Sequence, residues 1–272
     1  MTHTQPAPPP AAVPTEAPPL ILVGNGTRVP AGLDETTRLA DLVRALLPEV
    51  RVEVGYVELA EPALDEVLDT ILVESGAAVV VPLMAGPGGH VRQGVPRAVE
   101  GAKARHEDAT VIPTRHLGSP QPLIDAIHQR ITAARDTWPA DETDVVMAGR
   151  GSNDTDANAD HVRLSRVIFE TGGYRQVLSA FIQIVGPDLP QILHQYYSSG
   201  SRRIVVMPHA LFSGRLDESV RRLVDEFRAS HPDAEIRIAD VIGPCDELAE
   251  VVAQRTRRAP SGPAPRPAPA RT

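Results

Sequence analysis

Short apolar segments alternate along the chain with longer segments in which apolar residues recur at helical spacing. Four segments rich in β-branched residues have the length of strands: residues 20–23, 52–57, 78–81 and 110–112. Three segments between them follow the helical period instead: residues 36–47, 63–74 and 95–106. This alternation predicts an α/β fold in which helices flank a parallel sheet and ligands bind at the carboxyl ends of the strands.

The same order of segments recurs at an offset of 125 residues over most of its length. Matching pairs include Gly24-Asn25-Gly26-Thr27 with Gly149-Arg150-Gly151-Ser152, Tyr56 with Phe181, Pro62 with Pro187 and Gly118 with Gly243. So long a period indicates paired domains, because solenoid repeats are far shorter. We therefore predict two duplicated α/β domains, residues 19–137 and 143–256, that face each other across a cleft.

The two ends of the chain differ in composition from everything between them. Seven of the 27 prolines lie within residues 1–19 and five within residues 258–272. These segments have almost no large apolar side chains to bury, so we predict disordered tails over residues 1–18 and 257–272.

The charge and cysteine content exclude several classes of protein. The net charge of −8 argues against a general nucleic-acid binder, and no apolar run approaches the ~20 residues of a membrane helix. The single cysteine, Cys245, excludes an internal disulfide framework and a cysteine-based zinc knuckle. No secretion signal is visible, so we expect a cytoplasmic protein.

Each half begins with a strand that runs directly into a Gly-x-Gly-[Thr/Ser] loop. Such glycines let the backbone turn sharply and approach a ligand, although a plain tight turn explains them equally well. Neither loop extends to a Gly-x-Gly-x-x-Gly fingerprint or to a Walker lysine, so nucleotide binding lacks support.

Polar side chains follow three successive strands of the first half: Asn25, Glu58 and His90. We expect them to converge, because the carboxyl ends of parallel strands share one edge. A histidine there suits a borderline metal or a proton transfer near neutral pH, whereas each residue taken singly also fits a solvated rim. The second half has cationic or amide side chains at the matching places: Arg150, Gln183 and Arg215.

These segments resemble a two-domain CbiX-type sirohydrochlorin chelatase of the long actinobacterial form over about residues 19–256. The most specific parts are Gly88-Gly89-His90, Glu58-Leu59-Ala60-Glu61-Pro62 and Gly149-Arg150-Gly151-Ser152. The resemblance implies a lyase that inserts Co²⁺ or Fe²⁺ into a tetrapyrrole without ATP, in cobalamin or sirohaem biosynthesis. It implies no cofactor beyond that metal substrate, and it makes Glu58 and His90 the catalytic and metal-binding pair.

The family usually has a histidine in the first glycine loop, where this chain has Asn25. A neutral amide is a weak metal ligand and no base. We therefore expect His90, supported by Glu58, to bind the metal and accept protons, while Asn25 contacts the substrate. His209, at the end of the third strand of the second half, is expected to face the cleft as a substitute metal ligand.

Sirohydrochlorin is a polycarboxylate, and a guanidinium group binds a carboxylate through two parallel hydrogen bonds. Arginines near predicted strand ends are therefore expected to bind the substrate: Arg28, Arg92, Arg115, Arg150 and Arg215. For any one of them, an unpartnered surface arginine is the alternative interpretation.

The leading hypothesis is a chelatase, monomeric or homodimeric, whose partners are a tetrapyrrole and a divalent metal, and not nucleic acid or a membrane. One alternative is a non-catalytic tetrapyrrole- or metal-binding descendant that lost turnover together with the first histidine. The other is an enzyme of the same fold with a different substrate.

Overall fold

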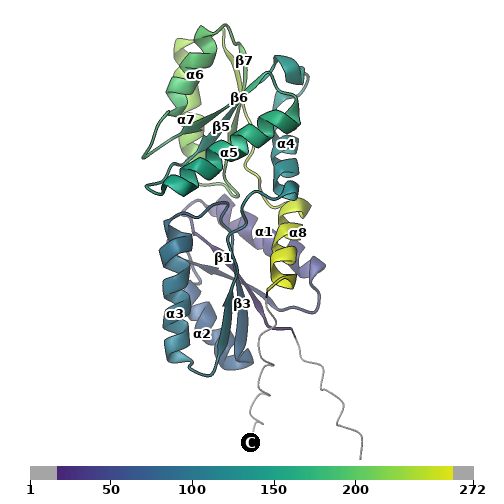
Figure 1. The fold of residues 1–272 in the computed structure, drawn as a ribbon, viewed down its shortest axis with the longest axis vertical. Coiled ribbons are helices and arrows are strands. Elements are labelled where there is room, and N and C mark those ends of the chain that lie inside the picture. The colour runs from purple at the N-terminus through teal and green to yellow at the C-terminus, as the bar shows by residue number, and fades with distance from the viewer. Residues whose placement is uncertain (1–16, 260–272) are drawn as a thin grey trace, which may run out of the picture.

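The computed structural model describes residues 17–259, apart from the side chains of His90 and Val91, and they form two α/β lobes stacked end to end (Figure 1). The first sequence half contains β1 (Leu20–Gly24), α1 (Pro30–Leu46), β2 (Val52–Tyr56), α2 (Leu64–Ser75), β3 (Ala77–Pro82), a π-helical turn η1 (His90–Gly94), α3 (Val95–Arg105), β4 (Thr110–Pro113) and α4 (Gln121–Arg135). The second contains a 3₁₀ turn η2 (Ala140–Glu142), β5 (Asp144–Gly149), α5 (Thr155–Gly172), β6 (Gln176–Phe181), α6 (Leu189–Ser198), β7 (Arg203–Pro208), α7 (Arg215–Ser230), β8 (Glu235–Ile238) and α8 (Asp246–Arg257).

Each lobe contains a four-stranded parallel sheet, ordered β2-β1-β3-β4 in the first and β6-β5-β7-β8 in the second. The register repeats as well, since Val23 pairs with Pro82 in the first sheet and Ala148 with Pro208 in the second. The central strands β1, β3, β5 and β7 are buried almost throughout, as strands covered on both faces must be. The predicted duplicated α/β fold is confirmed.

Two helical segments begin earlier than the sequence pattern predicts. Helix α1 was expected over residues 36–47 but begins at Pro30, where proline suits the first turn of a helix. Most of residues 30–35 are exposed or half-buried, so this part of the helix lacks the apolar spacing from which a helix is predicted. Likewise, a π-helical turn that begins at His90 precedes the helix predicted from residue 95, so the chain becomes helical before the apolar period begins.

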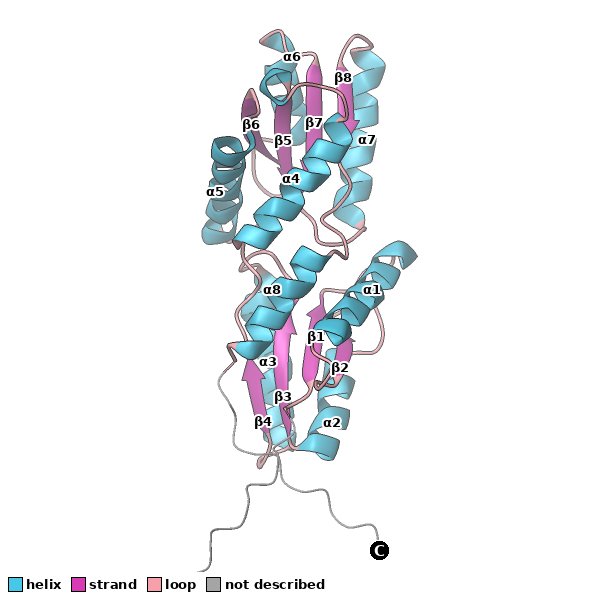
Figure 2. Cartoon of the chain, turned by 90° about the vertical axis from the view of Figure 1, so that its right-hand side faces the viewer, coloured by secondary structure: helices cyan, strands magenta, loops and turns pink. Residues whose placement is uncertain are grey.

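Each half of the sequence sends its last helix onto the other lobe. Helix α4 packs against β7 and β8 of the second sheet, and helix α8 packs against α1 and β3 of the first lobe. Figure 2 shows the two helices on the same side of the molecule, one across each sheet. The predicted boundaries therefore divide the sequence into two repeats, whereas the packed lobes exchange one helix.

A continuous hydrophobic cluster, here called the shared core, runs through both lobes on this side. It includes Leu22 of β1, Ile127 of α4, Met147 of β5 and Leu248 of α8, all of them almost completely buried. The opposite faces of the sheets have separate clusters, one under α2 and α3 and the other under α6 and α7. Because apolar burial is the dominant favourable contribution to folding, the shared core fixes one lobe relative to the other.

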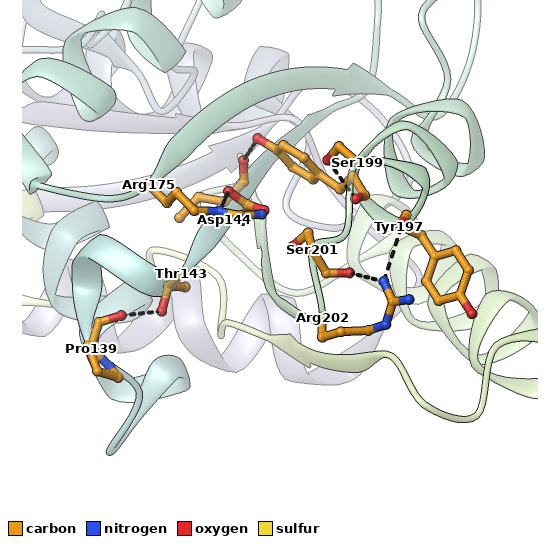
Figure 3. Close-up of polar contacts among 10 residues, drawn as sticks. Pro139, Thr143, Asp144, Arg175, Tyr197, Ser199, Ser201 and Arg202 are labelled. Atoms are coloured by element: carbon orange, nitrogen blue, oxygen red, sulfur yellow. Dashed lines mark hydrogen bonds and ion pairs between the residues drawn. The ribbon is translucent and has the colours of Figure 1, made fainter.

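Polar contacts hold the end of the second sheet that lies farthest from the first lobe (Figure 3). Asp144 is fully buried at the start of β5 and pairs with Arg175, whose Nε donates to Asp144 Oδ1 at 3.0 Å. Thr143 Oγ1 donates to the carbonyl oxygen of Pro139 at 2.7 Å. These contacts hold the strand ends together. Arg175 is needed there because a buried Asp144 carboxylate without a cationic partner would lower the stability of the fold.

Most of the two predicted tails, residues 1–16 and 260–272, lies outside the described residues. Helix α8 continues to Arg257, the first residue of the predicted C-terminal tail. Within residues 17–259, no helix is both long enough and apolar enough to cross a lipid bilayer.

The shared core predicts that the two lobes unfold together. Leu248→Ala should lower the free energy of unfolding by about 2–5 kcal/mol, because it leaves a cavity at the junction of the lobes. Urea unfolding followed by the fluorescence of the single tryptophan, Trp138, and by far-UV circular dichroism should give one coincident transition. Val73→Ala, on an exposed position of α2, is the control and should change little. Two separate transitions would contradict the prediction.

Candidate functional site

A cleft of about 1820 Å³ separates the carboxyl ends of the two sheets. The arrowheads of the strands in Figure 2 point toward each other from the two lobes. The loops that follow β1, β2 and β3 line one side of the cleft, and those that follow β5, β6 and β7 line the other. The cleft thus lies where ligands of parallel α/β sheets bind.

Asn25 and Glu58 are held next to each other in the wall formed by the first lobe. The Glu58 N–H donates to the carbonyl oxygen of Asn25 at 3.2 Å, and both residues line the cleft. Gly26 permits this contact, because a Cβ at that position would lie 1.7 Å from the Glu58 carbonyl oxygen. Asn25 Oδ1 is buried and has no hydrogen-bond partner among the described residues. An unsatisfied acceptor therefore lies beside the carboxylate residue.

The backbone of His90 lies at the start of η1, directly after two glycines, Gly88 and Gly89, that line the cleft. This places residue 90 at the predicted edge of the sheet. Its side chain lies outside the described part of the structure, so the expected meeting of His90 and Glu58 stays a prediction. Among the described residues, no three His, Cys, Asp or Glu side chains form a group able to hold a metal.

The second lobe repeats the backbone arrangement with different side chains. The Gln183 N–H donates to the carbonyl oxygen of Arg150 at 3.1 Å, matching the contact between Glu58 and Asn25. Gly151 permits it, since a Cβ there would lie 2.1 Å from the Gln183 carbonyl oxygen. Arg150, Gln183 and Arg215 all line the cleft. The same loop scaffold thus presents guanidinium and amide groups instead of a carboxylate.

Two equivalent loops carry exposed apolar residues in the left-handed region of backbone conformation. Leu59 has φ 64° and Ile184 has φ 70°, and both side chains line the cleft. Their exposed fractions are 48% and 55%, so burial does not explain why a large or β-branched residue occupies these positions. Residues other than glycine with positive φ are strained, and such residues cluster at functional sites.

A pair of histidines that contact each other lines the second lobe's side of the cleft. His209 Nδ1 lies 3.0 Å from His161 Nδ1, and His161 Nε2 lies 3.1 Å from the carbonyl oxygen of Met147. Burial lowers the pKa of His209 to about 3, with a smaller contribution from His161, and burial likewise lowers the pKa of His161. Both rings are therefore neutral near pH 7.

The predicted arginines fall into three groups. Arg28, Arg150 and Arg215 line the cleft, are exposed and form no ion pair with a described residue. Arg92 also lines the cleft, but its guanidinium pairs with two carboxylates of the other lobe, Asp154 at 2.7 Å and Asp156 at 3.2 Å. Arg115 is exposed on the loop after β4 and is not part of the cleft lining among the described residues.

A second contact joins the lobes at the rim, near the start of α1. The Glu35 carboxylate accepts hydrogen bonds from Ser213 N at 2.6 Å and from Ser213 Oγ at 2.8 Å. Gly32 allows the close approach, because a Cβ there would lie 2.2 Å from the Ser213 carbonyl oxygen. Together with the Arg92 ion pairs, this contact fixes the width of the cleft in the described structure.

Sequence reasoning missed several residues of the cleft. His161 lies on the buried face of α5 together with Leu164 and Ile168, a position typical of the hydrophobic core. Arg97 of α3 lines the cleft from within an amphipathic helix, where an arginine looks like a surface residue. His161 could have been found from the internal repeat. It lies 125 residues after Thr36, so both halves have a polar residue at the same position of an otherwise apolar helix face.

Both halves of the chain match the model of one protein family. The family model CbiX matches the chain twice, at residues 19–134 and 144–259. The chain belongs to the CbiX family. Both matches fall on the duplicated halves, so the family assignment and the internal repeat agree.

Curated relatives of this CbiX-family chain extend over most of its length. A sirohydrochlorin cobaltochelatase of Priestia megaterium is 25% identical over 249 residues, covering 89% of this chain and 80% of the relative. A sirohydrochlorin ferrochelatase of Bacillus subtilis is 22% identical over 216 residues, covering 79% of this chain and 82% of the relative.

Solved structures share the fold of both lobes. SirB from Bacillus subtilis with Fe³⁺ superposes with a TM-score of 0.76 at 22% identity, covering 88% of this chain and 93% of SirB. A structure described as CbiX, the terminal enzyme for biosynthesis of siroheme in denitrifying bacteria, gives a TM-score of 0.63 at 20% identity, covering 88% of this chain and 98% of that one. The likeness supports the two-lobed chelatase fold.

The strained conformation of Leu59 predicts a gain in stability when it is replaced by glycine. Leu59→Gly should raise the free energy of unfolding by about 1 kcal/mol, because glycine adopts positive φ without a clash and little packing is lost. Urea unfolding of the variant and the wild type measures the difference. Val162→Gly, on an exposed helical position, is the control and should be destabilised by roughly 0.5–1 kcal/mol. A loss of stability in Leu59→Gly would show that the leucine has a packing role.

Proposed function

We propose that this chain inserts Co²⁺ or Fe²⁺ into sirohydrochlorin without ATP, as a chelatase of cobalamin or sirohaem biosynthesis. The observation that carries the proposal is the position of Asn25 and Glu58, fixed side by side in a cleft of about 1820 Å³. That volume exceeds the roughly 300–1,000 Å³ of ordinary small-molecule pockets, as a macrocycle requires. Relatives of similar length carry the names sirohydrochlorin cobaltochelatase and sirohydrochlorin ferrochelatase.

Insertion exchanges both pyrrole N–H protons of the macrocycle for one divalent metal ion. The first lobe must therefore supply a ligand that holds the ion and a group that accepts protons. In the proposed mechanism His90 binds the ion, and Glu58 orients the imidazole ring or accepts a proton. Asn25 cannot accept a proton, but its unsatisfied Oδ1 accepts a hydrogen bond from a pyrrole N–H.

The carboxylates of the macrocycle need cationic partners in a protein whose net charge is −8. Arg28 of the first lobe and Arg150 and Arg215 of the second are proposed to bind them, because all three line the cleft without an ion-pair partner among the described residues. Arg92 is available only when a substrate carboxylate displaces Asp154 or Asp156. Arg115 has no part in the proposal, since it is absent from the described lining.

Both walls of the cleft come from one chain, so a monomer contains the whole proposed site and a homodimer would contain two. We place the reaction in the cytoplasm, where the single thiol of Cys245 stays reduced. No cofactor besides the metal substrate is part of the proposed reaction.

One observation favours a second candidate function. Asn25 stands where the family usually has a histidine, and a chain without that group is suited to bind a tetrapyrrole or a metal without turnover. Absorption spectra distinguish the two functions when the protein is mixed with sirohydrochlorin and Co²⁺ or Fe²⁺. A chelatase converts many equivalents of sirohydrochlorin per chain, whereas a carrier changes the spectrum only up to one equivalent.

Replacing the proposed ligand and its partner should stop insertion. We expect His90→Ala and Glu58→Gln to lower kcat by about 10²-fold or more, because each removes a group that holds the metal or takes a proton. The measurement is the rate of the spectral change at saturating sirohydrochlorin. Glu61→Gln is the matched control, since Glu61 lies in the same loop outside the cleft lining and accepts a hydrogen bond from Ala63 N. Full activity of His90→Ala would remove that residue from the site.

Asn25→His should raise the turnover number several-fold if the asparagine limits proton removal. The added imidazole supplies a base beside Glu58, close to the position of the unsatisfied Asn25 Oδ1. Arg150→His, the same substitution at the equivalent loop of the second lobe, is the control and should not raise the rate. An unchanged or lower turnover number in Asn25→His would indicate that Asn25 has been recruited to bind the substrate.

A further inference from the structure

The histidine pair of the second lobe has a fixed arrangement of protons. A carbonyl oxygen only accepts hydrogen bonds, so His161 must donate its Nε2–H to the Met147 carbonyl oxygen at 3.1 Å. In the neutral ring His161 Nδ1 then carries a lone pair and accepts from His209 Nδ1–H at 3.0 Å. His209 Nε2 is left with a lone pair and without a hydrogen-bond partner among the described residues.

The backbone constrains the position of both histidines. The His209 N–H donates to the carbonyl oxygen of Ala148 at 2.8 Å, which fixes the residue at the end of β7. His161 lies under Gly149, where a Cβ would come within 2.9 Å of the imidazole ring. Both histidines line the cleft. His209 is half-buried in the cleft wall and its Nδ1 is engaged by His161, so Nε2 is the ring nitrogen left for a ligand in the cleft.

The first lobe shows that the fold does not require these histidines. The position equivalent to His209 is Leu83, because Leu83 N donates to Val23 O at 2.8 Å just as His209 N donates to Ala148 O. The position equivalent to His161 is Thr36 in the same register of the first helix. An imidazole at this half-buried position needs a hydrogen-bond partner, which a leucine does not, so packing of the lobe alone does not require a histidine at position 209. The pair in the second lobe thus points to a ligand.

We propose that His209 Nε2 is a ligand of the divalent metal substrate, presented from the second lobe, and that His161 positions it through the Nδ1–Nδ1 hydrogen bond. The inference rests on the proposed function for the identity of the metal. Co²⁺ and Fe²⁺ both accept imidazole nitrogen. Histidines that ligate metals commonly donate their other ring N–H to a fixed acceptor, and here His161 and the Met147 carbonyl oxygen form that chain of acceptors.

The test uses Co²⁺ alone with the full-length chain, so it does not depend on turnover. Calorimetry and the visible absorption of bound Co²⁺ should show saturable binding to the wild type. We expect His209→Ala to weaken that binding at least tenfold and to change the Co²⁺ spectrum, because a nitrogen ligand is lost. His106→Gln, at the end of α3 away from the cleft, is the control and should bind as the wild type does.

Variants of His161 separate positioning from folding. His161→Gln keeps an acceptor for His209 Nδ1–H and should retain most of the Co²⁺ affinity, whereas His161→Phe removes the acceptor and should lose about 10–100-fold. Circular dichroism and thermal unfolding check that each variant is folded. Equal Co²⁺ affinity in folded His161→Phe and in the wild type would overturn the positioning role.

Two outcomes overturn the assignment of His209 as a ligand. One is the absence of saturable Co²⁺ binding by the wild type, and the other is wild-type affinity in His209→Ala. Failure of the proposed function gives a different result. The wild type would leave sirohydrochlorin unchanged, but its Co²⁺ affinity would still fall in His209→Ala.

Discussion

The shared core is the constraint on which the site depends. Because α4 and α8 each cover the sheet of the other half, neither lobe can turn away without exposing fully buried side chains such as Ile127 and Leu248. The carboxyl ends of the two sheets are thereby held facing each other, and the loops that follow the strands become the walls of one cleft. The rim contact between Glu35 and Ser213 adds a polar fixation at the edge of that cleft.

The duplication provides one scaffold with two sets of side chains. Gly26 and Gly151 allow the same close backbone approach in the two lobes, and Leu59 and Ile184 share the same strained conformation. What differs is the chemistry that this scaffold carries. The first lobe presents an amide, a carboxylate and the guanidinium group of Arg28, whereas the second presents Arg150, Arg215 and two neutral imidazoles. Each wall therefore carries both cationic groups that suit a polyanionic ligand and groups that suit a metal ion.

The sequence predicted local features well and long-range contacts poorly. Strand positions and the repeat offset followed from apolar runs and from matched glycines, because these depend on neighbours along the chain. The exchange of α4 and α8 was not predictable, since an amphipathic helix does not encode which sheet it will cover. Arg92 was predicted to bind substrate, yet it pairs with Asp154, which lies in the other repeat. His161 carries no local signal, because its role depends on His209 and on the end of β5.

A chelatase must hold a metal ion and then release it to the macrocycle, which restricts the ligands that it can use. Several anionic ligands around a divalent ion would bind it too tightly for transfer, because the opposite charges would have to be separated again. Among the described cleft residues to which the proposals give a role near the metal, only Glu58 is a carboxylate, and Asn25 and His209 are neutral. Other carboxylates line the wall of the second lobe, and two of them, Asp154 and Asp156, pair with Arg92. Neutral donors attract the ion more weakly. The main driving force for transfer is then the negative charge that the macrocycle gains when it loses its pyrrole protons. An asparagine at position 25 is therefore compatible with the proposed transfer when a neutral nitrogen of the opposite wall, His209 Nε2, shares the ion.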